Sequence, residues 1–526
     1  MSRDPARGEA LERKRLLLNS TSAALLFFVN VAVAFFLSPV IVRGLGNRDY
    51  GIWDLLLSFC GYLGLLEVGV GAALVRFVAR SAALGDHLEV GRTFVTSAAA
   101  LLSAGLVSLI VMSAVSLAPY RIFNVPSGES PVLAALCVLA GCNLLVQFAG
   151  IAPVAYLMGL QRHYRINSVR IVLAIASGVA TYLALTRGGG NGLLWLSCLL
   201  LAGNVTQYSV FLAWAIKSLG PGGLSPRLFS LRTLKELVVF GVNSSLLMLS
   251  DRIQRTSVPF VISHTIGVAS IVFYSIPARL AEYGLGLVTA IGFPLTPAFS
   301  AAEARGGVAE AREAWFVSSR PMQIVTLGIA LGLGTLGHDF IAVWIGRQYA
   351  NNAKWIVIFL AFTILVGGLA PNSTKLLVAL GRHGQVAWKL VAISALAVLA
   401  AVVAGRHLGL AGIAAAVSLA NVAGFALCWH RACAYLGIKM FQHMRATIVS
   451  VGPSVAVFAA ALLGLRALIR PSDYAGLAVV AGVSCLLYLG AVWRLAFDRE
   501  ARRAMAARLA ASVARLTGKP ARAGLS

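Results

Sequence analysis

Charged side chains inside apolar segments are the residues of this sequence best placed to do chemistry. Five of them fall in two consecutive apolar runs, 236–263 and 265–300: Asp251, Arg252, Arg255, Arg279 and Glu282. A charge at the centre of a membrane span is energetically costly, so such residues face a partner or a water-filled cavity and usually mark a functional site. We therefore expect this cluster to contact the molecule that the protein binds.

The spacing of these residues predicts two ion pairs and leaves one arginine over. Asp251 and Arg255 are four positions apart, so they lie on one helix face and can pair. Arg279 and Glu282, three positions apart, can pair in the same way. Arg252 has no acidic residue at helical spacing, and guanidinium groups bind phosphate and pyrophosphate through paired hydrogen bonds. The cluster therefore favours an anionic ligand, the alternative being two pairs that only hold neighbouring helices together.

Depth in the membrane favours a common site for two of the arginines. With a rise of about 1.5 Å per residue, Arg252 lies ~18 Å and Arg279 ~22 Å from the turn near His264, so both are expected near the midplane. Lys375, within the apolar run 355–378, either extends this basic site or reaches to the membrane interface. Asp251 and Glu282 are the candidates for coupling transport to protons or sodium, or else serve only as ion-pair partners.

Composition places the chain in the membrane. Of its 526 residues, 59% are hydrophobic and 12% charged, with a mean hydropathy of +0.84. Soluble domains contain roughly 25% charged residues. Apolar runs of about 20 residues, enough to cross the hydrocarbon core, recur along the chain and predict an all-α polytopic protein with about fourteen transmembrane helices. The predicted spans are 18–43, 51–75, 93–118, 131–160, 168–186, 191–216, 236–262, 266–298, 321–345, 355–378, 386–404, 409–429, 447–466 and 474–497.

The distribution of basic residues predicts the orientation of these spans. The net charge is +25, and 31 of the 44 Lys and Arg residues lie in alternate loops and the two termini. Placement in alternate loops is typical of the positive-inside rule rather than of a nucleic-acid surface, so both termini are expected in the cytoplasm and no nucleic acid is expected as a partner. The first apolar run is too long for a cleavable signal peptide.

An internal repeat predicts two lobes. "GLQRHYRINSVRIVLAI" from Gly159 and "ALGRHGQVAWKLVAI" from Ala379 each precede and open a span, six spans apart. An even number of intervening spans gives both copies the same orientation, as in two lobes related by an axis along the membrane normal, with a central cavity between them. The predicted organisation is an amphipathic cytoplasmic N-terminus (1–17), an N-terminal lobe (18–216), a cytoplasmic linker (217–235), a C-terminal lobe (236–429), two further spans (430–497) and a basic amphipathic cytoplasmic tail (498–526).

Motifs for catalysis and cofactor binding are missing from the sequence. It contains no GxxxxGK[ST] loop, HExxH, GxSxG or DxD motif, and its seven cysteines form no CxxC pair. We therefore predict no catalytic residues, no metal site, no disulfide framework and no cofactor. The predicted outer loops are short, which also argues against a glycan polymerase.

The segment 45–80, "LGNRDYGIWDLLLSFCGYLGLLEVGVGAALVRFVAR", carries the strongest motif. It resembles the opening of the polysaccharide (O-antigen and exopolysaccharide) exporters of the multidrug/oligosaccharidyl-lipid/polysaccharide superfamily. The residues that carry the resemblance are an LG pair, a YG pair, a (D/E)-x-G-x-G element and a basic exit, here Leu45, Gly46, Tyr50, Gly51, Glu67, Gly69, Gly71, Arg76 and Arg80.

This resemblance implies a flippase of the bacterial inner membrane with a cavity that opens alternately to either side. The implied cargo is an oligosaccharide on an undecaprenyl-pyrophosphate lipid, whose pyrophosphate would meet basic residues. By position these are Arg252, Arg255, Arg279 and Lys375. Membrane lipids, glycosyltransferases and a polysaccharide polymerase are the expected partners.

Two transport alternatives remain open. A multidrug or cation antiporter of the same superfamily would bind cationic cargo with unpaired carboxylates, which three mid-membrane arginines disfavour. A lipid II flippase of cell-wall synthesis would share the pyrophosphate cargo, and the sequence does not separate it from a polysaccharide exporter.

Overall fold

A computed structural model describes residues 5–67, 69–123, 130–187, 191–370 and 372–496. These described residues form fifteen α-helices and no strand, which agrees with the predicted all-α class. The first helices are α1 (Pro5–Leu63), α2 (Val70–Ala83), α3 (His87–Ser116), α4 (Pro119–Phe123), α5 (Ser130–Gly159), α6 (His163–Arg187), α7 (Gly192–Leu219) and α8 (Leu231–Thr265). The others are α9 (Ile271–Gly292), α10 (Leu295–Trp344), α11 (Arg347–Gly367), α12 (Ser373–Ala379), α13 (Gly384–Leu436), α14 (Met440–Ile469) and α15 (Tyr474–Ala491).

Short helical turns connect several of these helices. 3₁₀ turns are formed by η1 (Gly64–Glu67), η3 (Pro221–Leu224), η4 (Pro226–Leu228) and η5 (Val268–Ser270), and a π turn, η6 (Val492–Ala496), follows α15. The basic tail predicted at 498–526 lies outside the described residues, and α1 begins within the predicted N-terminal segment.

Ten stretches of the described chain are long and apolar enough to cross a membrane, so this is a multi-pass membrane protein. Three of these stretches each contain two predicted spans or most of them: Leu18–Glu67, Val268–Trp344 and Gly384–Leu436. Helix α8, 35 residues long, covers the predicted span 236–262. The number of fourteen crossings and the orientation stay predictions.

Glycines interrupt the longest helices where the sequence predicts one span to end and another to begin. Gly46 in α1 has φ 73° and ψ 174°, and Gly409 in α13 has φ 61° and ψ −146°. A left-handed φ costs an L-residue roughly 1–2 kcal/mol, whereas glycine adopts it freely. These two kinks are therefore encoded by residue type.

The span predicted at 51–75 is not one continuous helix, so this prediction is wrong in that respect. Helix α1 ends at Leu63, the turn η1 follows, and α2 starts at Val70 after Gly69, which has φ 69°. A discontinuous helix at membrane depth leaves backbone groups without helical partners and is tolerated where it lines a cavity.

The described chain divides into two compact units. Unit 1 contains residues 1–276 and 387–420, and unit 2 contains residues 277–386 and 421–526. Unit 1 thus includes α8 and much of α13, which the sequence division assigns to the C-terminal lobe. The lobe boundaries drawn from the sequence stay a prediction.

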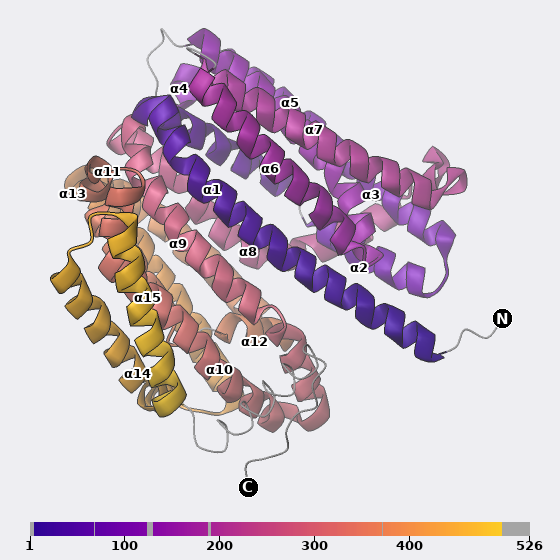
Figure 1. The fold of residues 1–526 in the computed structure, drawn as a ribbon. Helices are drawn as coiled ribbons and strands as arrows, with labels where there is room; N and C mark the ends of the chain where they lie inside the picture. The colour runs from indigo at the N-terminus through magenta and orange to yellow at the C-terminus, as the bar shows by residue number, and fades with distance from the viewer. Residues whose placement is uncertain (1–4, 68, 124–129, 188–190, 371, 497–526) are drawn as a thin grey trace. The chain divides into compact units, whose positions relative to one another are not determined.

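In unit 1, helices α5, α6 and α7 lie side by side, and α3 packs along α5 (Figure 1). Glycines allow α3 and α5 to approach closely: a Cβ at Gly105 would lie 3.1 Å from Leu145 Cα, and one at Gly141 would lie 2.9 Å from Met112 Cβ. Small residues at such contacts are typical of helix packing in membranes. Helix α1 packs against α6 and also against α8.

In unit 2, α14 and α15 form a pair whose inner face packs on α10. Phe458 stacks on Tyr488 with ring centroids 4.5 Å apart, and the Tyr488 hydroxyl donates to the carbonyl of Ile324, 2.8 Å away. A second cluster surrounds buried Trp315, which stacks on His443 with a centroid distance of 4.1 Å.

The two copies of the predicted repeat adopt the same turn. Gln161 and Gly381 both have a left-handed φ, of 58° and 64°. In each copy the next residue donates from its backbone N–H to a carbonyl five positions earlier, Arg162 to Leu157 and Arg382 to Leu377. The repeat seen in the sequence is therefore also a repeat of local structure.

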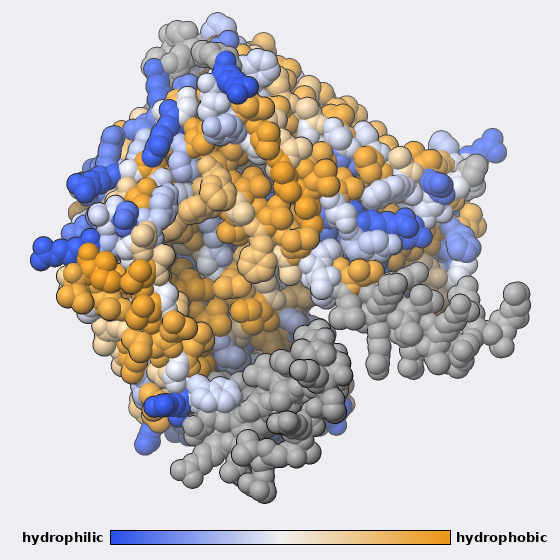
Figure 2. Space-filling model, in the orientation of Figure 1, coloured by the Kyte–Doolittle hydropathy of each residue, from blue (hydrophilic) through white to orange (hydrophobic). Residues whose placement is uncertain are grey.

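The surface of the pair formed by α14 and α15 is mostly hydrophobic. Figure 2 shows hydrophobic side chains along these helices and hydrophilic ones near both ends. Large apolar side chains that are more than half exposed include Leu463, Leu468, Leu486 and Leu489. An apolar surface of this kind is suited to lipid rather than to water.

Candidate functional site

The interruption between α1 and α2 places a carboxylate at the start of α2. Glu67 is the last residue of η1, and its side chain accepts a hydrogen bond from the backbone N–H of Gly71. A Cβ at Gly71 would lie 2.7 Å from Glu67 Oε1, so this carboxylate lies close against the start of the helix. A negative charge is favourable there, because the N-terminus of a helix carries partial positive charge.

Helix α8 brings Arg252 to the same interruption. The Arg252 guanidinium donates from Nη1 to the carbonyl of Gly61, 3.4 Å away in the last turn of α1, where carbonyls have no helical partner. The helices are close here, since a Cβ at Gly61 would lie 2.5 Å from Thr256 Cγ2 and one at Gly64 would lie 3.0 Å from Arg252 Nη1. Arg252 and Glu67 are near enough to attract each other electrostatically.

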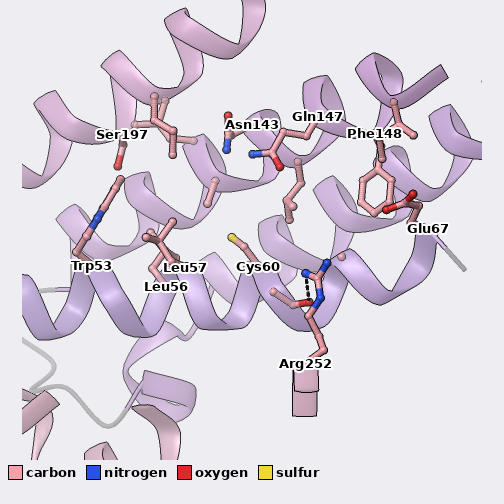
Figure 3. Close-up of a pocket in the computed structure, with 17 residues that line it drawn as sticks. Trp53, Leu56, Leu57, Cys60, Glu67, Asn143, Gln147, Phe148, Ser197 and Arg252 are labelled. Atoms are coloured by element: carbon pink, nitrogen blue, oxygen red, sulfur yellow. Dashed lines mark hydrogen bonds between the residues drawn. The ribbon is translucent and has the colours of Figure 1, made fainter. Parts of the chain in front are cut away.

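These two charged residues line a cavity of 350 Å³ within unit 1. Its walls come from α1, α5, α7 and α8, and the Arg252 side chain extends from α8 toward it (Figure 3). Polar groups join the charged ones: the amides of Asn143 and Gln147 from α5 and the hydroxyl of Ser197 from α7. Trp53 and Phe148 add aromatic surface. The cavity can therefore bind an anion together with a polar, hydrogen-bonding group.

A row of amides holds the polar wall of this cavity in place. Gln207 Nε2 donates to Asn204 Oδ1, and Asn204 Nδ2 donates to Asn143 Oδ1, each at 2.8 Å. The first bond lies within α7 and the second joins α7 to α5. Asn204 and Gln207 line a neighbouring pocket of 530 Å³ that is also lined by Arg170. Amides that hydrogen-bond each other keep fixed orientations, which favours selective recognition.

The ion pair expected within α8 is present. Arg255 Nε lies 2.8 Å from Asp251 Oδ2, and at least half of each of these two side chains is exposed. Exposed ion pairs add little stability. What this pair binds, and whether Asp251 couples transport to an ion, stay predictions.

The remaining candidate residues belong to unit 2. Arg279 and Glu282 lie three positions apart on α9, and both take part in polar or electrostatic interactions. Lys375 on α12 is partly buried against the end of α9, since a Cβ at Gly292 would lie 1.7 Å from Lys375 Nζ. A cation is favourable at the C-terminus of a helix. A common pyrophosphate site of Arg252, Arg255, Arg279 and Lys375 stays a prediction.

Comparison with protein families identifies the chain. A family model described as polysaccharide biosynthesis protein matches residues 16–303, more than half of the sequence. The chain belongs to this polysaccharide biosynthesis family. No curated protein matches it at the level of sequence.

Solved structures show that the family member has the fold of the MOP superfamily transporters. The lipid II flippase MurJ in an inward closed conformation matches with a TM-score of 0.68 and 12% identity over 91% of this chain and 98% of that one. An inward-facing multidrug resistance MATE family transporter matches with a TM-score of 0.66 and 14% identity, over 80% and 99%. A MOP superfamily transporter from Pyrococcus furiosus, with a described reverse polarity of its binding pocket, gives 0.59 and 16% identity, over 80% and 95%.

Most residues of the family signature have structural roles. Gly46 and Gly69 adopt left-handed φ values, and Tyr50 is buried with 4% of its surface exposed. Gly51 packs closely against the backbone carbonyl of Val268 in η5. Arg76 lies over the Phe240 ring, 4.6 Å from its centroid. Of the signature residues, Glu67 is the one that lines the cavity.

Sequence reasoning missed the neighbour of Arg252. In the sequence, the charged cluster of the two consecutive spans contains three arginines and two carboxylates. The structure adds a third carboxylate, because Glu67 lies near Arg252 on the same cavity. Sequence reasoning also missed the amides of Asn143 and Gln147. Their occurrence four positions apart within an otherwise apolar run is the signal that could have revealed a polar face on α5.

Proposed function

We propose that the protein is a flippase that moves an oligosaccharide linked to a polyprenyl pyrophosphate across the inner membrane of a bacterium, for surface polysaccharide synthesis. Membership in the polysaccharide biosynthesis family and the fold of MOP superfamily transporters support this proposal. The observation that carries it is Arg252, a cation that faces a cavity of 350 Å³ with amide and hydroxyl groups on its walls.

Arg252 acts in this proposal by exchanging partners. Without cargo, Glu67 and the carbonyl of Gly61 balance its charge. A pyrophosphate is a stronger partner, because it offers several charged oxygens to the guanidinium fork. Binding of cargo then releases Glu67 from Arg252 and loosens the link between α8 and the α1–α2 interruption. This link is the element through which cargo binding would favour a change of conformation.

The amides of the cavity fit the sugar end of such a cargo. Asn143 and Gln147 offer both donors and acceptors, which suit the hydroxyls of a sugar ring. Trp53 on the same cavity offers an apolar face for the carbon-bound hydrogens of the ring. A cavity for a hydrophobic cation would instead have unpaired carboxylates and few amides, so the multidrug alternative is less well supported.

Surface glycan production tests the proposal in cells. A strain that lacks the gene is complemented with the wild type, with Arg252→Ala, and with Arg187→Ala as a matched control, since Arg187 is an exposed arginine that does not line the cavity. We expect loss of surface glycan with Arg252→Ala at normal protein level, and full glycan with the control. Wild-type glycan with Arg252→Ala would refute the role of this arginine. Lysis on depletion, with no glycan defect, would indicate a lipid II flippase instead.

A further inference from the structure

A second pocket, of 620 Å³ and with several charged side chains on its walls, lies in unit 2 where α10 ends, α11 begins and α14 ends. It is separate from the cavity of Arg252, because none of its lining residues belongs to unit 1. Its polar lining includes His338, Asp339, Arg347, Asn351, Arg466 and Arg470. The sequence topology places this end of the helices on the extracytoplasmic side.

One of the three arginines is held by an aspartate. Arg466 Nε lies 2.6 Å from Asp339 Oδ2 and its Nη2 lies 3.2 Å from Oδ1, a two-point contact between α14 and α10. The Asp339 side chain is only 16% exposed, and His338 Nδ1 lies 3.2 Å from the same carboxylate. The Asp339 carboxylate therefore neutralises the charge of Arg466 and leaves the other two arginines without compensation.

The other two arginines have no ion pair within 4 Å among the residues that the structure describes. Arg347 is the first residue of α11, where the positive end of the helix disfavours a cation. Arg470 directly follows α14 and has a left-handed φ of 48°. This backbone conformation is unfavourable for a residue other than glycine, so the surrounding structure must hold Arg470 in it. The neighbouring Asp473 is not among the residues that line the pocket, and its Oδ1 accepts the backbone N–H of Gly476 at 2.7 Å, which caps α15.

The pocket also has an apolar wall. Leu463 and Ala467 of α14 line it, and Leu463 is 55% exposed. Leu468 on the same helix is 82% exposed and is one of the exposed apolar side chains of α14 and α15. Cationic groups next to an exposed hydrocarbon-facing surface match a ligand with a phosphate at one end and acyl chains at the other.

We propose that this pocket binds the phosphate of an anionic phospholipid, with Arg347 and Arg470 as its ligands and α14 beside its acyl chain. Arg466, fixed by Asp339, contributes positive potential and keeps the pocket open. A soluble phosphate would use the arginines and leave the apolar wall without a role. This lipid site is independent of the proposed transport function.

Binding of fluorescent phosphatidylglycerol to the purified full chain in neutral detergent tests the proposal. The double variant Arg347→Ala/Arg470→Ala is compared with Arg121→Ala/Arg187→Ala, which removes two exposed arginines from the same predicted side outside the pocket. We expect roughly thirtyfold weaker binding in the first variant, from the usual attraction of two arginines to anionic lipid, and unchanged binding in the second.

Competition and charge rescue complete the test. Arg347→Lys/Arg470→Lys keeps both charges and should bind more tightly than the double alanine variant, which separates a binding defect from a folding defect. Wild-type affinity in the double alanine variant would overturn the proposal. If phosphatidylcholine displaces the fluorescent lipid as well as unlabelled phosphatidylglycerol does, charge plays no part and the proposal is overturned. If inorganic phosphate displaces it equally well, the pocket is a site for soluble anions rather than for lipid.

Discussion

Replacing Gly51 by alanine is the sharpest steric test of the fold around the cavity. Gly51 on α1 faces the backbone of Val268 in η5, and a Cβ at this position would lie 2.1 Å from the Val268 carbonyl oxygen and 2.9 Å from its carbonyl carbon. A carbon–oxygen contact is normally about 3.3 Å or longer, so the added methyl group overlaps by roughly 1.2 Å.

The cost follows from which atoms would have to move. The obstacle is backbone rather than a flexible side chain, and η5 is held by the bond from Ser270 N–H to the Gly267 carbonyl, 3.1 Å long. Overpacking of this kind costs ~1–3 kcal/mol of stability, and a backbone obstacle places Gly51→Ala at the upper end of that range.

Thermal unfolding of the purified protein in detergent measures this effect. The matched control is Gly464→Ala in α14, where a Cβ meets no atom within 4 Å and alanine favours the helix by about 0.5–1 kcal/mol. We expect Gly51→Ala to lower the unfolding midpoint and Gly464→Ala to leave it unchanged or raise it slightly. Equal midpoints for Gly51→Ala and the wild type would refute the close contact between α1 and η5.

Three further predictions concern single residues. Gly46→Ala should cost roughly 1–2 kcal/mol, although space is free there, because φ is 73°; the same unfolding assay measures this. His443 precedes the span predicted at 447–466, and its burial against Trp315 lowers its pKa to about 4. The unfolded state therefore binds more protons than the folded state, and the stability of the protein should fall as the pH drops from ~6.5 to 4. Unfolding midpoints measured across this range should fall less for His443→Phe than for the wild type. Asp339→Asn should cost ~1.5 kcal/mol of unfolding free energy, at the low end for a charged hydrogen bond, because Arg466 is 38% exposed; no loss in a denaturation series would contradict this.

Much of the fold could be predicted because apolar run length and loop polarity are local properties. The span predicted at 131–160 is observed as α5, Ser130–Gly159, and the span predicted at 191–216 is α7, Gly192–Leu219. The break in the span predicted at 51–75 could not be predicted from hydropathy. It depends on a left-handed glycine and a 3₁₀ turn inside a run that is apolar apart from Asp54 and Glu67.

In the candidate site, contacts between residues close in the sequence could be predicted, whereas contacts between distant residues could not. Asp251 and Arg255 are one helical turn apart, so their ion pair follows from the spacing alone. Glu67 and Arg252 are 185 positions apart in the sequence, and only the packing of α8 against α1 and α2 brings them together. A count of charges along two consecutive spans therefore overstated the positive excess at Arg252.

Transport of a pyrophosphate-linked lipid in proteoliposomes tests the central claim most directly. The rate of flipping of a fluorescent undecaprenyl-pyrophosphate oligosaccharide is compared between the wild type, Arg252→Ala and Arg187→Ala. Loss of a charge-assisted hydrogen bond of ~1.5–3 kcal/mol predicts a flipping rate roughly tenfold to a hundredfold lower for Arg252→Ala and an unchanged rate for the control. A folded Arg252→Ala protein that flips this lipid at the wild-type rate would contradict the account.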